Sequence, residues 1–203
     1  MKQVSVKSIT RNYILALLIV AVLSAVSFFI LRTIISTEET RAAAVNVSGR
    51  QRMLSQRIAL YSLRLVIADS SEKRNELRGT LRKTMSQMSE AHISLTNGDV
   101  EKGLPKPSAN IKKIYFGQPL NLNKQVLDYL MTAKELADTN DSQLTLKDKK
   151  LESLIEASSR RLLQSLNMAV EEYQVESERT IASLQIVLVG IIVTILLTLM
   201  IEA

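Results

Sequence analysis

The sequence predicts an all-α protein, an antiparallel up-down four-helix bundle flanked by two transmembrane helices. Two apolar runs, 13–31 and 180–201, contain no charged residue, and each is long enough as a helix to cross a hydrocarbon core of about 30 Å. Residues 32–179 are polar and rich in Leu, Ala, Lys, Arg, Glu and Gln, which all favour helix. This stretch has no two-residue alternation of the kind that predicts strands.

Composition excludes several classes of protein. The 203-residue chain has no cysteine, which excludes disulfides, thiol chemistry and cysteine metal sites. Its net charge is +6, but it lacks the interleaved aromatic residues and the motifs of nucleic-acid-binding domains, so we expect no nucleic-acid partner. A soluble cytosolic enzyme does not fit a chain with two uncharged runs of this length.

The first apolar run has two interpretations, a cleaved signal peptide or an uncleaved membrane span. Its 19 residues exceed the usual apolar core of a signal peptide, about 7–15 residues, and no small-x-small cleavage site follows. A transmembrane helix is therefore the favoured interpretation.

The charge of the N-terminal tail predicts the topology. The tail has three cations, Lys2, Lys7 and Arg11, and no acid, so the positive-inside rule keeps it in the cytoplasm. The prediction is then a cytoplasmic tail at 1–12, a span at 13–31, an extracytoplasmic domain at 32–179, a second span at 180–201, and the start of a cytoplasmic part at 202–203. We expect the output domain to lie outside this chain.

Turn signals divide the domain into four helices. Asp69-Ser70-Ser71 and Thr139-Asn140-Asp141-Ser142 favour turns, and the segment 97–119 contains all three prolines. Short connections imply antiparallel neighbours. The predicted helices are 33–68, 71–96, 121–139 and 146–180. The last shows a core stripe of Leu151, Ile155, Leu162, Leu166, Ala169 and Tyr173.

The first helix has an unusual charge pattern and two opposed stripes. From Thr40 to Ala68 it has five arginines and no acid, and planar guanidinium groups recognise flat oxyanions through paired N–H donors. One stripe with alternating spacings of three and four reads as the bundle core: Thr40, Ala44, Val47, Gln51, Leu54, Ile58, Tyr61 and Leu65. A second lies about 160° away: Ala42, Val45, Gly49, Arg52, Gln56, Ala59 and Leu63.

The second stripe predicts a contact with a twofold-related copy. Its small residues permit close approach, and its spacing is that of a coiled-coil seam. A homodimer would bring two Arg52 side chains together, and these repel unless an anion lies between them. The alternative is that Arg52 extends outward into solvent.

The segment VNVSGRQRMLSQRIAL, from Val45 to Leu60, resembles the signature of PilJ-type sensory domains. These domains form the N-terminal part of type IV pili methyl-accepting chemotaxis transducers and other bacterial membrane receptors. The segment is also similar to the related box in nitrate/nitrite sensor histidine kinases, although Arg50-Gln51 between the glycine and Arg-Met places it on the PilJ side.

The resemblance implies a receptor in the bacterial inner membrane with a periplasmic sensor that binds nitrate, with nitrite as a second candidate, at a homodimer interface. It implies that Arg52 holds the ion and that Gly49 leaves room for it. The other motif positions are Asn46, Ser48, Arg50 and Met53, and Arg57 adds positive potential. The runner-up function is a ligandless periplasmic dimerisation or protein-interaction module.

No other residue pattern predicts chemistry. His92 is the only histidine, and we interpret it as a satisfied or exposed helical residue. The chain has neither a nucleophile motif such as G-x-S-x-G nor a glycine-rich phosphate loop. We therefore expect no enzyme activity, metal site or cofactor.

Overall fold

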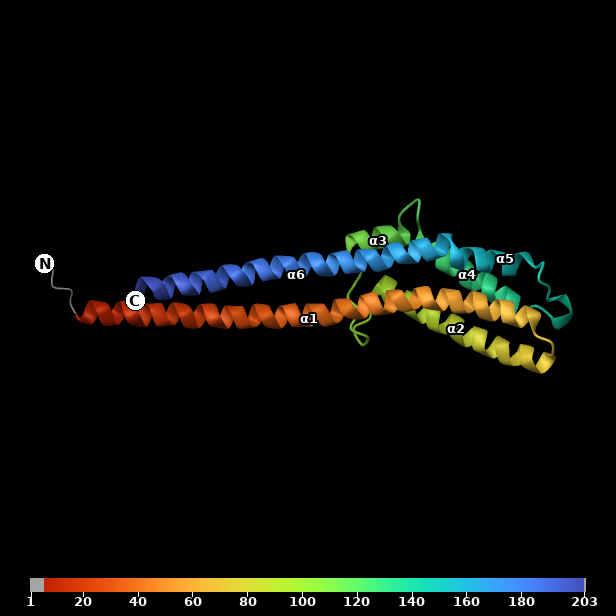
Figure 1. Ribbon diagram of the computed structural model, residues 1–203, viewed down its shortest axis with the longest axis horizontal. Coiled ribbons are helices and arrows are strands. Elements are labelled where there is room, and N and C mark those ends of the chain that lie inside the picture. The colour runs from red at the N-terminus through yellow and green to blue at the C-terminus, as the bar shows by residue number, and fades with distance from the viewer. Residues whose placement is uncertain (1–5, 203) are drawn as a thin grey trace. The chain divides into compact units, whose positions relative to one another are not determined.

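A computed structural model describes residues 6–202 as a chain of helices (Figure 1). The predicted tail at 1–12 and the predicted segment 202–203 thus lie partly outside the described residues. The α-helices are α1 (Val6–Ile67), α2 (Ser71–Asn97), α3 (Ala109–Phe116), α4 (Leu122–Ala137), α5 (Lys149–Ser159) and α6 (Arg161–Glu202), with a 3₁₀ turn η1 (Asp141–Gln143). The all-α prediction is confirmed for these residues, and the up-down four-helix arrangement stays a prediction.

The chain divides into two compact units. One contains the described residues up to Glu39 together with those from Glu176 onward, and the other is Thr40–Val175. Two helical stretches, Tyr13–Ile67 and Lys149–Thr198, are long and apolar enough to cross a membrane, and large apolar side chains of the first unit, such as Phe28, Phe29 and Ile186, are exposed. The predicted span 13–31 lies inside the first stretch and most of 180–201 lies inside the second, while the bounds of the spans and their orientation in a membrane stay predictions.

Two predicted elements differ from the structure. The segment 97–119 contains α3, whose N-cap Ser108 accepts a hydrogen bond from the backbone N–H of Ile111. The predicted helix 146–180 begins at Lys149 and is interrupted at Arg160, where φ is −131° and ψ is −99°. The break puts the residues before and after it out of register, so Leu154 is buried and the predicted core residue Ile155 is 40% exposed.

The core of Thr40–Val175 is built on the predicted inner stripe of α1. Ala44, Leu54, Ile58 and Leu65 are buried and belong to one apolar cluster with residues of the other helices of this unit. Two tyrosine hydroxyls cross between helices and donate to backbone carbonyls, Tyr129 to Ser55 at 2.6 Å and Tyr173 to Leu95 at 3.4 Å. Each ring thus fills apolar space while its hydroxyl satisfies a buried carbonyl.

A buried polar network joins four helices around His92. Asn123 Oδ1 accepts from His92 Nε2 at 2.7 Å, and His92 Nδ1 lies 3.0 Å from Gln51 Nε2. The Tyr115 hydroxyl donates to Gln51 Oε1 at 3.5 Å. Since the Asn123 oxygen can only accept, Nε2 carries the proton and Nδ1 accepts from Gln51. The interpretation of His92 as a satisfied helical residue is confirmed.

The connection between α4 and η1 is fixed by ion pairs with α2. The Asp141 carboxylate lies 2.7 Å from Arg78 Nη2 and accepts a hydrogen bond from Ser71 at 2.9 Å, and these bonds hold its pKa below the usual value. Arg78 also donates to the carbonyls of Ala137 and Thr139 at 2.9 and 2.7 Å. One guanidinium therefore satisfies carbonyls that the end of α4 leaves unpaired.

The His92 network predicts a pH dependence of stability. Burial lowers the pKa of His92 below 6.5, so the unfolded chain binds the proton more readily and stability falls as the pH drops below about 6.5. The contributions of Asp99 and Asp141, whose pKa values are lowered, persist down to about pH 4. Thermal unfolding of the detergent-solubilised chain between pH 5 and 7 should show this loss, and His92→Gln should remove it. Equal slopes in both proteins would contradict the assignment.

Candidate functional site

The outer face of α1 is the candidate site, and its position differs from the predicted second stripe. Ala59 was expected on this face, but it is only 7% exposed and lies on the packed side, so that prediction is wrong. The line of exposed and half-exposed residues is rotated by about 40° at about 100° per residue. It contains Asn46, Gly49, Met53, Gln56, Leu60, Leu63 and Ile67, which we call the outer seam.

The outer seam keeps alternating spacings of three and four, which is the pattern of a coiled-coil contact. Met53, Leu60 and Ile67 are exposed large apolar side chains spaced seven residues apart. On a helix face that stays in water, regular spacing of apolar residues brings no stabilisation, because no other surface packs against them. The pattern therefore indicates a face that another surface covers.

Arginines flank the outer seam on both sides. Arg50, Arg57 and Arg64 line one side at seven-residue intervals and are exposed. Within the part of the chain that the structure describes, their guanidinium groups have no hydrogen bond or ion pair. No acidic residue is present in α1 from Thr40 to its end. The positive potential of this face is therefore not neutralised by the helix itself.

Arg52 flanks the other side of the outer seam and has one hydrogen-bond partner among residues 6–202. Its Nη1 donates to Oδ1 of Asn167 on α6 at 3.1 Å. Asn167 is neutral, so this bond orients the guanidinium without cancelling its charge. The remaining N–H donors of Arg52 and the Asn167 amide N–H₂ are groups that recognise an oxyanion.

Gly49 lies one helical turn before Arg52, on the same face. A Cβ atom added at Gly49 would meet no atom within 4 Å, so the fold of the single chain does not require a glycine there. The missing side chain leaves open space beside the Arg52 side chain. A ligand or a second chain could use that space.

The predicted site residues do not all share this face. Asn46, Arg50, Arg52, Met53 and Arg57 are exposed and Gly49 is half-exposed, so the structure brings these six to the outer side. Ser48 is 1% exposed, and its hydroxyl donates to the Val45 carbonyl at 3.0 Å. Ser48 therefore lies on the packed side of α1, away from the outer seam.

Sequence reasoning missed Asn167. Asn167 is 115 positions from Arg52 in the sequence, and it lies in a stretch of ordinary helix formers without a motif. One indication was available in the sequence. Asn167 directly follows Leu166, a predicted core residue, and a polar residue next to a core position lies at the edge of the packed face of a helix. That signal does not identify the partner.

The fold and the site together define a class of protein. An all-helical fold in a chain with two helices long and apolar enough to cross a membrane is consistent with a membrane receptor. The family model described as type IV pili methyl-accepting chemotaxis transducer N-term, PilJ, matches residues 33–143, more than half of the chain. The chain belongs to the PilJ family, which is a family of sensory transducer domains, so the resemblance of Val45 to Leu60 to PilJ-type domains is confirmed, and the similarity to nitrate/nitrite sensor kinases stays a prediction.

The other two comparisons gave no relatives. No curated protein and no solved structure matches the chain.

The open space at Gly49 predicts that an added methyl group there fits the folded chain, and Gly79 provides a matched control. Gly79 of α2 is also a mid-helix glycine whose added Cβ would meet nothing within 4 Å. Gly49→Ala and Gly79→Ala should each stabilise the folded chain by about 0.5–1 kcal/mol, because alanine loses less backbone entropy in a helix. Denaturant unfolding measures both.

Only the Gly49 substitution should alter what the outer seam binds, because its methyl group would occupy the space beside Arg52. Destabilisation by Gly49→Ala with stabilisation by Gly79→Ala would show that the glycine is needed by the single chain after all.

Proposed function

We propose that the chain is the ligand-sensing input module of a bacterial transmembrane receptor and binds a small planar oxyanion at a homodimer interface formed by α1. Nitrate is the favoured ligand, and nitrite is the second candidate. The observation that carries the proposal is Arg52. Its guanidinium lies on the outer side of α1, oriented by a neutral amide at 3.1 Å and beside the open space at Gly49.

The chemistry of Arg52 supports a planar monoanion. A guanidinium group presents parallel N–H donors in one plane, which match two oxygens of a flat oxyanion. Chloride is a sphere without this geometry, and sulfate is tetrahedral and has a second charge. The amide of Asn167 supplies further N–H donors next to Arg52, so Asn167 joins Arg52 and Gly49 in the proposed site. Asn46, Arg50 and Met53 are its exposed neighbours on α1, and Arg57 adds to the positive potential.

The outer seam supports a second copy of the chain as the partner. Its apolar residues at seven-residue spacing match the contact surface of a two-helix coiled coil. The same face has several arginines and no acidic residue, so two copies repel each other when no anion is present. An anion held between the two chains reduces this repulsion, and ligand binding and dimerisation then strengthen each other.

The sequence pattern supports the membrane arrangement. We infer that residues 1–12 are cytoplasmic, that 13–31 and 180–201 span the inner membrane, and that 32–179 form a periplasmic four-helix bundle. The cations of the tail favour this orientation. α1 and α6 are each one uninterrupted helix (Figure 1). A displacement of either helix at the sensor face is therefore transmitted along its own backbone.

The resemblance of the Gly-x-x-Arg-Met segment to the box of nitrate/nitrite sensor kinases supports nitrate as the ligand. The alternative function is a ligandless dimerisation or protein-interaction module, which the apolar outer seam also favours. The two functions differ at Arg52. A ligandless interface has no use for an unneutralised guanidinium beside an open space, because burying such a charge is costly.

Nitrate titration of the detergent-solubilised chain by calorimetry tests the proposal. We expect nitrate to bind, and chloride and sulfate to bind much more weakly. Arg52→Ala should abolish measurable binding, because each charge-assisted hydrogen bond contributes about 1.5–3 kcal/mol. Arg52→Lys keeps the charge and loses the paired donors, so it should recover little affinity. Arg57→Ala should weaken binding only modestly.

The matched control for Arg52 is Arg64, another exposed arginine of α1 about 18 Å further along the helix. Arg64→Ala should leave the affinity for nitrate within a factor of about two, since the distance exceeds a Debye length at physiological salt. Equal affinities in Arg52→Ala and the parent chain would exclude this site. Absence of nitrate and nitrite binding to the parent chain would favour the ligandless alternative.

The dimer is tested with two leucines of equal exposure. Leu60 in the outer seam and Leu127 on α4 are both 52% exposed. Leu60→Glu should prevent nitrate-promoted dimerisation, because it places a charge in the apolar contact, whereas Leu127→Glu should leave dimerisation unchanged. Sedimentation in detergent with and without nitrate measures both. A parent chain that stays monomeric at saturating nitrate would refute the shared site.

A further inference from the structure

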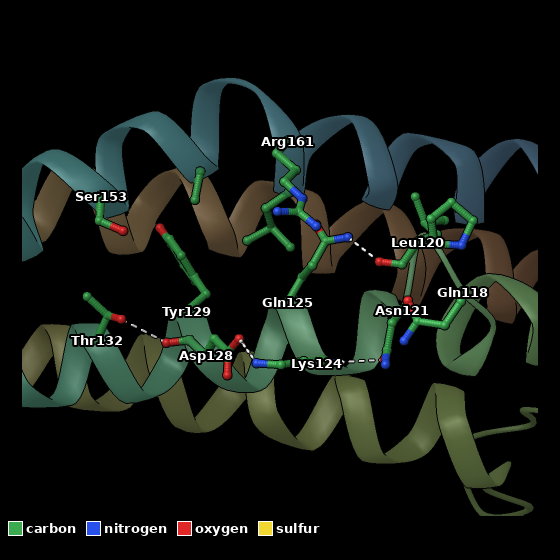
Figure 2. A pocket seen from close by; sticks show the side chains of 13 residues that line it. Gln118, Leu120, Asn121, Lys124, Gln125, Asp128, Tyr129, Thr132, Ser153 and Arg161 are labelled. Atoms are coloured by element: carbon green, nitrogen blue, oxygen red, sulfur yellow. Dashed lines mark hydrogen bonds and ion pairs between the residues drawn. The ribbon is translucent and has the colours of Figure 1, made fainter.

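A cavity lies on a different part of the helical unit from the outer seam. It has a volume of about 350 Å³ and is bounded by α4, by α5 and by the first residues of α6, next to the helix break at Arg160 (Figure 2). None of the predicted site residues of α1 lines it. Its chemistry is therefore separate from that of Arg52.

The exposed side chain of Arg161 lines one side of the cavity. Figure 2 shows Arg161 extending from the start of α6 toward Gln125 of α4. Across the described residues, the Arg161 guanidinium makes no hydrogen bond or ion pair. No hydrogen bond joins this guanidinium to Gln125, whose Oε1 accepts from Ser165 at 3.1 Å and whose Nε2 donates to the Leu120 carbonyl at 2.6 Å.

The other charged groups at the cavity neutralise each other. Lys124 Nζ lies 2.6 Å from Asp128 Oδ2, one helical turn further along α4. The lining thus has one closed ion pair and one open guanidinium, a net charge of +1. This charge favours an anion over a neutral molecule.

Hydrogen-bonding groups and apolar walls define the rest of the ligand. The Ser153 hydroxyl of α5 lines the cavity and makes no hydrogen bond to any described residue. Pro119, Leu120, Ala157 and Leu162 supply apolar surface. The Tyr129 ring also lines the cavity, but its hydroxyl is occupied by the Ser55 carbonyl.

The size of the cavity favours an organic anion over a small inorganic one. Its volume falls at the low end of the range for small-molecule pockets, about 300–1,000 Å³, and far exceeds the space that a four-atom oxyanion fills. An anion with an apolar body fills the remaining volume and covers the walls. A carboxylate matches the paired donors of Arg161.

We propose that this cavity is a binding site for a small organic monocarboxylate, held by Arg161 through its carboxylate and by the α4–α5 walls through an apolar body of a few carbons. A ligand bound there contacts α4, α5 and α6 at the place where α5 and α6 separate. The site is independent of the proposed oxyanion site on α1, so either proposal can fail alone.

The test uses the full chain in detergent and calorimetric titration with butyrate. We expect saturable binding at millimolar concentration or tighter, and no binding of butyramide, which has the same carbon chain without the charge. Affinity should rise from acetate to butyrate, as each added methylene covers apolar wall. The free amino acid alanine serves as a further probe. Its ammonium group would need a carboxylate partner, and Asp128 is already paired with Lys124. Alanine should therefore bind more weakly than butyrate.

Two variants locate the site. Arg161→Gln should weaken butyrate binding at least about tenfold, as expected for loss of a charge-assisted pair of hydrogen bonds. The matched control is Arg160→Gln at the adjacent position, whose side chain is 78% exposed and lies 3.8 Å from Glu156. It is absent from the cavity lining and should leave the affinity unchanged.

Three results would decide against the proposal. Equal butyrate affinities in Arg161→Gln and the parent chain would overturn it, as would the absence of binding by any carboxylate of the series. Arg52→Ala should bind butyrate normally, which separates failure of this site from failure of the oxyanion site. Loss of butyrate binding in Arg52→Ala would assign the carboxylate to the α1 face and refute the second site.

Discussion

Unneutralised positive charge on one side of α1 is the constraint that organises the functional part of this protein. Between Asn46 and Ile67 the helix has four arginines and no acidic residue, while its opposite side is buried in the core. A helix in this situation cannot turn its charged side inward, because burying an unpaired guanidinium is too costly. The charge must therefore face solvent, an anion or an anionic surface. The outer seam lies on this side of α1, with arginines on both of its flanks.

The rotation of α1 about its axis decides how that charge is used. Gln51 is buried and contacts both His92 and Tyr115, and Tyr129 donates to the Ser55 carbonyl one turn later. These directional bonds fix the helix more tightly than apolar packing alone, which tolerates small rotations. Arg52 follows Gln51 directly, so the network that holds Gln51 also aims Arg52 at the edge of the outer face, within reach of Asn167.

Two positive sites on separate elements suit a sensory module. Arg52 belongs to the longest helix, and Arg161 begins α6 immediately after the break at Arg160. Each has guanidinium donors that no carboxylate of the described residues neutralises. The break gives α6 a start that is distinct from α5, so the ligand proposed at Arg161 would act on α6 without requiring α5 to move with it as one rigid helix.

The sequence by itself determined the helical class, the two apolar spans, the charge pattern of α1 and the PilJ motif. All of these depend on local composition and periodicity, which a single chain displays directly. Tertiary structure decided the rest. The burial of Ala59, the inward position of Ser48, the break at Arg160 and the Arg52–Asn167 bond each depend on how a helix rotates against neighbours distant in the sequence. Arg52 and Asn167 are 115 residues apart, and helical periodicity fixes faces only to within some tens of degrees, so only packing could bring the two side chains together.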